Sequence, residues 1–209
     1  WASYYGGSDN DGIYSIAIDI NQDLYVTGGT RSTNLPSTTS GLFPTNQGGF
    51  TDGYIAHIHK NGNQILHGTY IGSNYYDQSF FVDVDKYNNV YVFGQTLDTG
   101  SVFIFNAIWN MPGKSQFISK LNSSLSAFIW STQFGRASST GLDVSPSAFM
   151  VDLCNRVYLS AWGSDLSGSN LSSSSTSGLP LKTNAFQSTT DGDDYYFLVL
   201  LDDASDLSY

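Results

Sequence analysis

Three short stretches of the sequence decide the fold. They are Leu24-Tyr25-Val26-Thr27-Gly28, Val90-Tyr91-Val92-Phe93-Gly94 and Val157-Tyr158-Leu159-Ser160-Ala161. Each is rich in β-branched and aromatic residues, as β-strands are. Each also follows an apolar stretch that ends in an aspartate and a turn: Ile16-Ala17-Ile18-Asp19, Val82-Asp83-Val84-Asp85 and Phe149-Met150-Val151-Asp152. The chain therefore repeats a pair of strands three times.

Two further elements follow each pair. The third element is Tyr54-Ile55-Ala56-His57-Ile58, Phe117-Ile118-Ser119-Lys120-Leu121 and Tyr196-Phe197-Leu198-Val199-Leu200. The fourth ends in Ile65-Leu66-His67-Gly68-Thr69 and Phe128-Ile129-Trp130-Ser131-Thr132. Equivalent residues of the first and second elements are always 7 apart, and those of the third and fourth are 13 apart. Constant spacing indicates tight hairpins, because one added residue would turn every side chain to the wrong face.

Four short strands in tandem repeat predict an all-β fold, a β-propeller of four-stranded antiparallel blades. We expect residues 1–209 to form part of one propeller domain, with blade units at about 1–67, 68–130 and 131–209. The connections between the second and third elements vary in length, and all should emerge on one face of the disc. Three blades are fewer than the roughly 4–8 of a closed ring, so we expect an arc of a larger propeller, with copies that assemble to complete a ring as the alternative. Trp1 and Tyr209 stand at the repeat position of His67 and Trp130, so we expect an excerpt that starts and stops inside a fourth strand.

The composition excludes several classes of protein. The formal net charge is −10, which argues against nucleic acid as a partner, since phosphate binding needs a basic surface. Charged residues make up 12% and aromatic residues 15% of the chain, which fits neither a disordered segment nor a helix bundle. The sequence lacks an apolar run of the length that a membrane-spanning helix needs, so we expect no membrane insertion. A single cysteine, Cys154, allows no internal disulfide, and we expect it to be a small buried apolar residue.

Two acidic stretches are candidate cation sites. Asp19-Ile20-Asn21-Gln22-Asp23 places oxygen ligands at alternate positions, as a Ca²⁺ loop does, but it lacks the glycine and the terminal glutamate of such a loop. Asp and Asn are also good turn residues, and this reading is favoured. Asp191-Gly192-Asp193-Asp194 is a denser cluster on the variable face, where a weak Ca²⁺ site is an alternative.

The three histidines, His57, His59 and His67, are candidate metal ligands in principle, because His57 and His59 share one face of a strand. His57 aligns with Lys120 and Val199, and His67 aligns with Trp130 and Tyr209. Ordinary structural roles are therefore favoured, and no serine, histidine and aspartate form a recognisable catalytic motif. The sequence predicts no catalytic residue, no cofactor site and no metal site.

Large aromatic residues on the long connections offer a second kind of site. A row of exposed rings would suit stacking on sugars, whereas rings that fold back would fill gaps between blades. The second reading is favoured. The residues concerned are Phe43, Phe50, Phe105, Trp109, Trp162 and Phe186.

The repeat resembles the bacterial β-propeller repeats of large secreted proteins. That pattern closes each blade with a Thr-Tyr-x-Gly-Gly motif, seen here as Ser3-Tyr4-Tyr5-Gly6-Gly7, Thr69-Tyr70-Ile71-Gly72-Ser73 and, more divergent, Thr132-Gln133-Phe134-Gly135. It opens the third strand with an aspartate, present as Asp52 and Asp194 but replaced by Ser115 in the second unit. Residues 151–163 and 184–192 are similar to the propeller region of Bacteroidetes gliding-motility-associated surface proteins, which are cargoes of the type IX secretion system.

The resemblance implies an extracellular or cell-surface protein and brings no catalytic residues. The predicted function is a non-enzymatic scaffold and binding module, in adhesion or gliding motility, within a large secreted or surface protein. Its expected partners are neighbouring blades or domains of the same larger protein, and an extracellular glycan or surface protein. The alternative is a carbohydrate-binding or polysaccharide-processing propeller.

Overall fold

A computed structural model describes residues 1–137, 141–163 and 174–207. Their regular structure consists of β-strands, listed in chain order: β1 Asp11–Ile18, β2 Leu24–Thr30, β3 Asp52–Ile58, β4 Ile65–Ile71, β5 Asp77–Val84, β6 Val90–Thr96, β7 Gln116–Leu121, β8 Phe128–Phe134, β9 Ser145–Val151, β10 Val157–Trp162 and β11 Tyr195–Leu200. Within these residues, no helix has the length and hydropathy that crossing a membrane requires.

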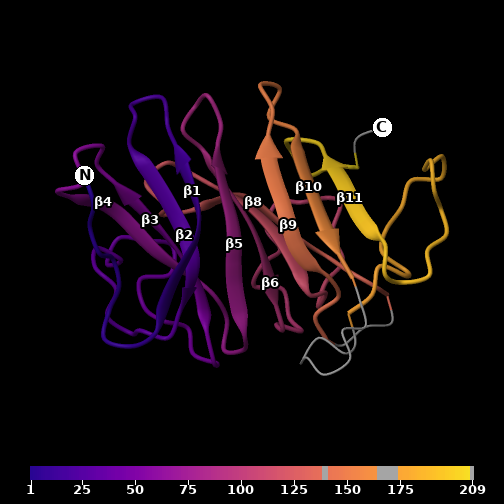
Figure 1. The fold of residues 1–209 in the computed structure, drawn as a ribbon, viewed down its shortest axis with the longest axis horizontal. Coiled ribbons are helices and arrows are strands. Elements are labelled where there is room, and N and C mark those ends of the chain that lie inside the picture. Colours follow the sequence, from indigo (N-terminus) through magenta and orange to yellow (C-terminus); the bar gives the residue numbers. More distant parts are fainter. Residues whose placement is uncertain (138–140, 164–173, 208–209) are drawn as a thin grey trace.

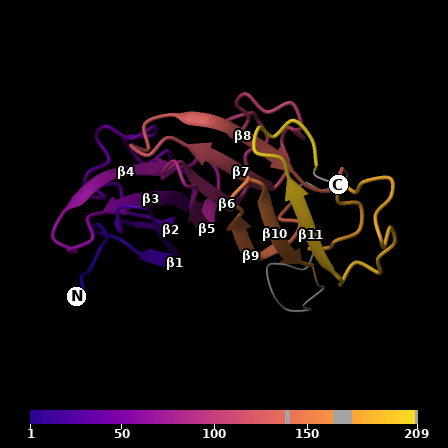
Figure 2. The same ribbon diagram turned by 90° about the horizontal axis from the view of Figure 1, so that it is seen from above.

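The strands form three antiparallel sheets in chain order (Figure 1). Sheet 1 is β1-β2-β3-β4, sheet 2 is β5-β6-β7-β8, and sheet 3 contains β9, β10 and β11. The first strands contact one another, β1 with β5 and β5 with β9. Seen from above, β1 and β9 lie on the inner side of an arc, and β4 and β8 lie on its outer side (Figure 2). The all-β propeller architecture predicted from the repeat is therefore confirmed. Residues 67 and 130, where the predicted units end, lie inside β4 and β8, because those units follow a repeat position and not a sheet boundary.

Sheet 3 has three strands among the described residues, followed by one bridge. Leu200 and Leu207 form an isolated bridge. The equivalent pairs in sheets 1 and 2, Ile58 with Ile65 and Leu121 with Phe128, are each the pair nearest the turn between the third and fourth strands. Tyr209, expected in a fourth strand, lies outside the described residues.

The first residues depart from the prediction. Trp1 was expected in a fourth strand, but residues 1–10 form no strand. A fourth strand takes its hydrogen bonds from a third strand, whereas Trp1 lies beside the β3–β4 turn. There its indole nitrogen donates to the Lys60 carbonyl at 2.5 Å.

An aspartate fixes the turn between the first and second strands of every sheet. In sheet 1, Asp19 Oδ1 accepts hydrogen bonds from the amides of Asn21 and Asp23, at 2.8 and 2.9 Å. Asp85 and Asp152 repeat this pair of bonds in sheets 2 and 3. The turn also has one residue in the left-handed region at the same position of each sheet: Gln22, Asn88 and Asn155. The recurring aspartate of the sequence is thus a turn brace.

Cys154 corrects a prediction. It was expected to be buried, but it is exposed. Its position is two residues after Asp152 in the braced turn, where its amide donates to the Asp152 carboxylate. The equivalent residues, Asn21 and Tyr87, are exposed as well. The turn geometry directs this side chain to solvent whatever the residue is.

The glycine that ends the second-strand motif is required by close backbone approach. A Cβ on Gly28 would lie 1.7 Å from the Gly12 carbonyl oxygen of β1, and one on Gly94 would lie 2.4 Å from the Gln78 carbonyl oxygen of β5. Both positions lie beside an irregularity in the strand register. Since a side chain would force the first two strands apart there, glycine is retained in these two sheets.

The sheets pack face to face in a constant sense. We name the two faces of each sheet after its second strand: the front face carries Tyr25, Tyr91 or Tyr158, and the back face carries Val26, Val92 or Leu159. The front face of sheet 1 packs on the back face of sheet 2 in one apolar cluster, which includes Tyr25, Ile55, Val82 and Val92. The front face of sheet 2 packs on the back face of sheet 3 in another, which includes Phe93, Ile118, Leu159 and Leu198. Each sheet therefore relates to the next as the blades of a propeller do.

The long connections leave the sheets at the end that joins the second strand to the third, here called the loop end. They do not stay there. In the β2–β3 connection Phe43 bridges Tyr70 of β4, and in the β6–β7 connection Phe105 bridges Ser131 of β8. Both connections continue to the next sheet, where the Leu42 amide donates to the Leu125 carbonyl and the Trp109 amide donates to the Ala204 carbonyl. They thus cover the outer edges of β4 and β8 and tie neighbouring sheets together. Covered edges protect a sheet against unwanted strand pairing.

Leu125 tests the tie between sheets 1 and 2. It is fully buried in the cluster between these sheets, within the β7–β8 turn. We predict that Leu125→Ala lowers the free energy of unfolding by about 2–5 kcal/mol, because it removes buried methyl groups and leaves a cavity. Leu153→Ala, at a leucine that is 82% exposed, is the matched control and should change it by less than about 0.5 kcal/mol. Equal effects in urea titrations would contradict the packing described.

Candidate functional site

At the end of each sheet where the first and second strands are joined, here called the hairpin end, a basic side chain lies beside the aspartate of the braced turn. The register places His57, Lys120 and Val199 opposite the second-strand tyrosines Tyr25, Tyr91 and Tyr158. These equivalent positions allow a direct comparison of the three sheets.

In sheet 2 the group is an ammonium. Lys120 Nζ lies 3.5 Å from Asp85 Oδ2 and 2.6 Å from Asp202 Oδ1. It also lies over the ring of Tyr91, 4.9 Å from the centroid. The Tyr91 hydroxyl donates to Asp202 at 2.6 Å, which with burial raises the pKa of Tyr91. A buried carboxylate is here neutralised by a buried cation, the arrangement that burial of charge requires.

In sheet 3 the group is a guanidinium that comes from the turn itself. Arg156 Nε lies 2.9 Å from Asp152 Oδ2, and the Tyr158 hydroxyl donates to the same oxygen at 2.9 Å. The amides of Arg156 and Cys154 and the Tyr158 hydroxyl hold the pKa of Asp152 below its usual range, against a raising effect of desolvation. The aspartate again has a positive partner.

In sheet 1 the group is a histidine between two aspartates. His57 Nε2 lies 4.0 Å from Asp19 Oδ2 and 3.9 Å from Asp23 Oδ2. One ligand-type atom from each residue lies within 4.8 Å of the others, and all three residues are buried. The His57 ring stacks on Tyr25 at 4.0 Å between centroids and faces His67 at 5.7 Å. Burial lowers the pKa of His57, although the two carboxylates oppose that shift.

The sequence did not bring these three residues together. It offered Asp19 and Asp23 as a Ca²⁺ loop or a turn, and the turn brace is what the hydrogen bonds show. It paired His57 with His59, whereas His57 lies beside His67 on the neighbouring strand and His59 Nδ1 accepts from the Asn61 amide. The usable signal was the alignment of His57 with Lys120, a cation beside the equivalent aspartate.

The second acidic stretch precedes β11. Asp191 and Asp193 are exposed, and the Asp193 amide donates to Asp191 Oδ1 at 3.1 Å. Gln187 donates to Asp194 Oδ2 at 3.3 Å. These bonds are those of a polar surface turn.

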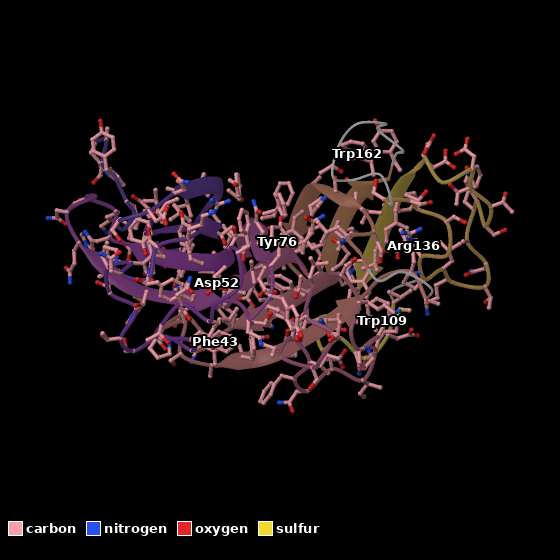
Figure 3. All side chains as sticks on the ribbon, turned by 90° about the horizontal axis from the view of Figure 1, so that it is seen from below. Phe43, Asp52, Tyr76, Trp109, Arg136 and Trp162 are labelled. Atoms are coloured by element: carbon pink, nitrogen blue, oxygen red, sulfur yellow. The ribbon has the colours of Figure 1, made fainter. Side chains whose placement is uncertain are left out.

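The six aromatic residues of the connections do not form one row. Phe43 and Trp109 pack against apolar clusters on the outer side of the sheets, and Trp162 lies in β10 on the other side (Figure 3). Phe105 is half-exposed in its bridge to Ser131, and Phe186 is fully exposed. For Phe43 and Trp109 the gap-filling reading is confirmed.

Phe50 belongs to a pocket at the loop end. The Arg31 guanidinium lies 3.7 Å from the centroid of its ring. The pocket has a volume of about 330 Å³, and its lining includes Tyr14, Tyr76, Asp11 and Gln78. Tyr76 is labelled near the middle of the loop end in Figure 3. Aromatic rings and hydrogen-bonding groups thus meet around one concave surface.

Asp52 is a buried carboxylate at the same end. Its Oδ2 accepts from the Gln47 amide at 2.5 Å, and its Oδ1 has no hydrogen-bond partner among the described residues. Burial raises the pKa of Asp52 to about 7; the Gln47 amide lowers it, and the charge of Asp77 raises it further. Burial likewise raises the pKa of Asp77, although hydrogen bonds from Thr96 and Ser73 oppose the shift. The two carboxylates therefore disfavour ionisation in the folded chain.

Sequence similarity to a known repeat supports the architecture. A family model described as a β-propeller repeat matches residues 1–36. Among solved structures, BamB from Moraxella catarrhalis aligns with 73% of this chain at 13% identity and a TM-score of 0.27. The chain spans about half of that structure, 48% of its length. No curated protein matches the chain.

The repeat match and the sheet arrangement together define the class of protein. The chain is an all-β protein of the β-propeller type, and it contains a β-propeller repeat region. Such a region serves as a scaffold that can carry binding surfaces.

The raised pKa of Asp52 predicts a pH dependence of stability. Its carboxyl has a pKa of 3.8 when unperturbed and about 7 in the fold, so between these values the folded chain holds a proton that the unfolded chain has lost. Stability should therefore fall as pH rises from about 4 to 7, by at most about 1.4 kcal/mol per pH unit from this group. Asp52→Asn should flatten this slope in urea titrations at pH 5, 6 and 7.

The matched control is Asp203→Asn. Asp203 is exposed, and hydrogen bonds from Ser205 lower its pKa, so its replacement should leave the downward slope in place. An Asp52→Asn variant whose stability follows the same pH curve as the parent chain would contradict the assignment.

Proposed function

We propose that the chain is a non-catalytic scaffold and binding segment of a larger β-propeller. The observation that carries this proposal is the exposure, on sheets 1 and 3, of apolar side chains at positions that the repeat elsewhere buries. On sheet 1 these side chains belong to β1, whereas Val26, Tyr54 and Tyr70 of the same face are buried. The docking partners are then further blades, in the same larger protein or in a second copy.

The face of sheet 1 that is turned away from sheet 2 is its back face. Ile16 stands at the position of Val82 and Phe149 and is 59% exposed, whereas Val82 is 5% exposed between sheets 1 and 2. Ile18 on the same face is also exposed. Residues 1–5 and this face together line an open hollow of about 980 Å³.

The face of sheet 3 that is turned away from sheet 2 is its front face. Phe197 stands at the position of Ile55 and Ile118, which are fully buried, yet it is 74% exposed. Met150 and Tyr195 share this face and are exposed too. Within the chain a front face always packs on a back face, so the two exposed faces are complementary. Exposed apolar side chains gathered on one face of a sheet favour an interaction site.

The proposed location and biological role of the scaffold depend on the sequence resemblance. We propose an extracellular or cell-surface location and a role in adhesion or gliding motility. The low charge fits a protein that displays polar, uncharged loops from a rigid frame. Asp19, Asp85 and Asp152 serve as turn braces, and Asp85 also pairs with Lys120. This structural use of the recurring carboxylates supports a non-enzymatic role.

Self-association of the purified chain tests the scaffold. We predict concentration-dependent head-to-tail association in sedimentation velocity, because each copy offers one front face and one back face. Ile18→Lys and Phe197→Lys should each weaken it about tenfold or more, since an unpaired ammonium would be buried. An equimolar mixture of the two variants should form a one-to-one dimer, because each variant keeps one intact face.

Phe186→Lys is the control for these variants, because Phe186 is fully exposed and belongs to neither face. It should associate like the parent chain. A parent chain that stays monomeric at millimolar concentration would overturn the docking proposal, as would variants that associate as strongly as the parent.

The loop-end pocket favours a second candidate function, carbohydrate binding. Phe50 is 65% exposed, and Arg31 over its ring holds it in place, while Asp11 and Gln78 offer hydrogen-bonding groups nearby. Sugars are bound by stacking on such rings together with hydrogen bonds to their hydroxyl groups.

A glycan array tests this second candidate. Bound glycans should lose about 3- to 10-fold in affinity in Phe50→Ala and keep it in the control Phe186→Ala. Binding that survives Phe50→Ala unchanged would place the glycan elsewhere. Cleavage of a bound polysaccharide by the purified chain would contradict the non-catalytic role.

A further inference from the structure

We propose that Asp19, Asp23 and His57 bind one divalent cation of the zinc class at the hairpin end of sheet 1. This site is independent of blade docking and of the loop-end pocket.

The two carboxylates are held ready for such a cation. Asp19 Oδ1 accepts from the amides of Asn21 and Asp23, and Asp23 Oδ1 accepts from the Lys60 amide at 2.8 Å. Backbone groups therefore fix one oxygen of each carboxylate, and both Oδ2 atoms face His57. Asp19 Oδ2 also accepts a hydrogen bond from the Asn21 side-chain amide at 3.3 Å. Outer partners of this kind orient metal ligands in known sites.

The buried histidine lacks hydrogen-bond partners, and this points to a ligand independently of the two carboxylates. His57 is 93% buried, as its 7% exposure shows, and neither ring nitrogen has a hydrogen-bond partner among the described residues. A buried polar group without a partner is rare and costly. Its Nε2 atom points between the two Oδ2 atoms at 3.9 and 4.0 Å. Ligand atoms around tetrahedral zinc are about 3.4 Å apart, so a small contraction would complete the geometry.

The other two sheets show what the position requires. Beside the braced aspartate, sheet 2 places the Lys120 ammonium and sheet 3 the Arg156 guanidinium. Sheet 1 has two carboxylates and a buried histidine at this point. Lys60, whose backbone amide donates to Asp23, directs its ammonium to the Asn21 carbonyl at 3.4 Å. A bound divalent cation would supply the positive charge that a lysine or arginine side chain supplies in the other two sheets.

The donor set selects the metal. Imidazole is a ligand for zinc and neighbouring first-row metals, whereas Ca²⁺ and Mg²⁺ prefer sites made entirely of oxygen. Three protein ligands leave one tetrahedral position for water. Only 13% of the Asp23 side chain is exposed, but this exposure provides a route to solvent.

Zinc binding to the EDTA-treated 209-residue chain tests the proposal. Calorimetric titration should show one Zn²⁺ per chain at micromolar or tighter affinity, with no comparable binding of Ca²⁺. With free zinc about 100-fold above Kd, the ratio of folded to unfolded chain should rise about 100-fold, and Tm should rise by roughly 5–10 °C.

Sheet 2 provides the matched variants. His57→Lys reproduces the Asp85–Lys120 pair, so it should keep the Tm of the metal-free chain and lose its response to zinc. Asp23→Asn reproduces Asn89 of the same sheet and should weaken zinc binding about 100-fold or more, since even outer partners of a site cost about 10- to 100-fold. His59→Gln should bind zinc as the parent chain does.

Zinc affinity weaker than millimolar in the parent chain would overturn the proposal. The same holds if His57→Lys binds zinc like the parent chain, because the ion would then be held at other surface groups. Should His57→Lys fail to fold, Asp23→Asn decides: unchanged affinity in that variant also overturns the site.

Discussion

Burial of apolar side chains between successive sheets is the constraint on which the rest of the structure depends. The front face of one sheet meets the back face of the next, as Tyr25 and Val82 do between sheets 1 and 2. A single sheet of this size has two apolar faces and cannot bury both alone, so the sheets are stable only as a stack. The same constraint explains why the edge-covering connections reach forward to the following sheet.

The repeat in the sequence was sufficient to predict the strands, the hairpins and the propeller type, because constant spacing reflects the two-residue period of a strand. It could not predict the course of the long connections, whose lengths differ and whose contacts to β4 and β8 are tertiary. Trp1 and Cys154 were misplaced for a related reason. Position in a repeat does not tell whether a pairing strand lies alongside, or which way a turn directs its side chain.

The candidate cation site also depends on tertiary contacts that the sequence could not predict. Asp19 and Asp23 are close in the chain, but His57 reaches them only through the pairing of β2 with β3. In the sequence, the alignment of His57 with Lys120 and Val199 favoured an ordinary structural role. The argument for a cation comes from comparison with Lys120 and Arg156, which show that sheets 2 and 3 place positive charge beside the braced aspartate. Internal repeats thus serve as their own reference: a departure from the repeat identifies a candidate site.

Nuclear Overhauser contacts between side chains of different sheets measure the face-to-face stacking most directly. The account predicts contacts between the rings of Phe93 in sheet 2 and Phe149 in sheet 3, whose centroids are 5.9 Å apart, and contacts of the Val82 methyl groups with the apolar cluster of sheet 1. Ile16, on the outer face of sheet 1, should show no contact with sheet 2 in the monomer. Contacts from Ile16 to sheet 2, with none between Phe93 and Phe149, would contradict the propeller arrangement.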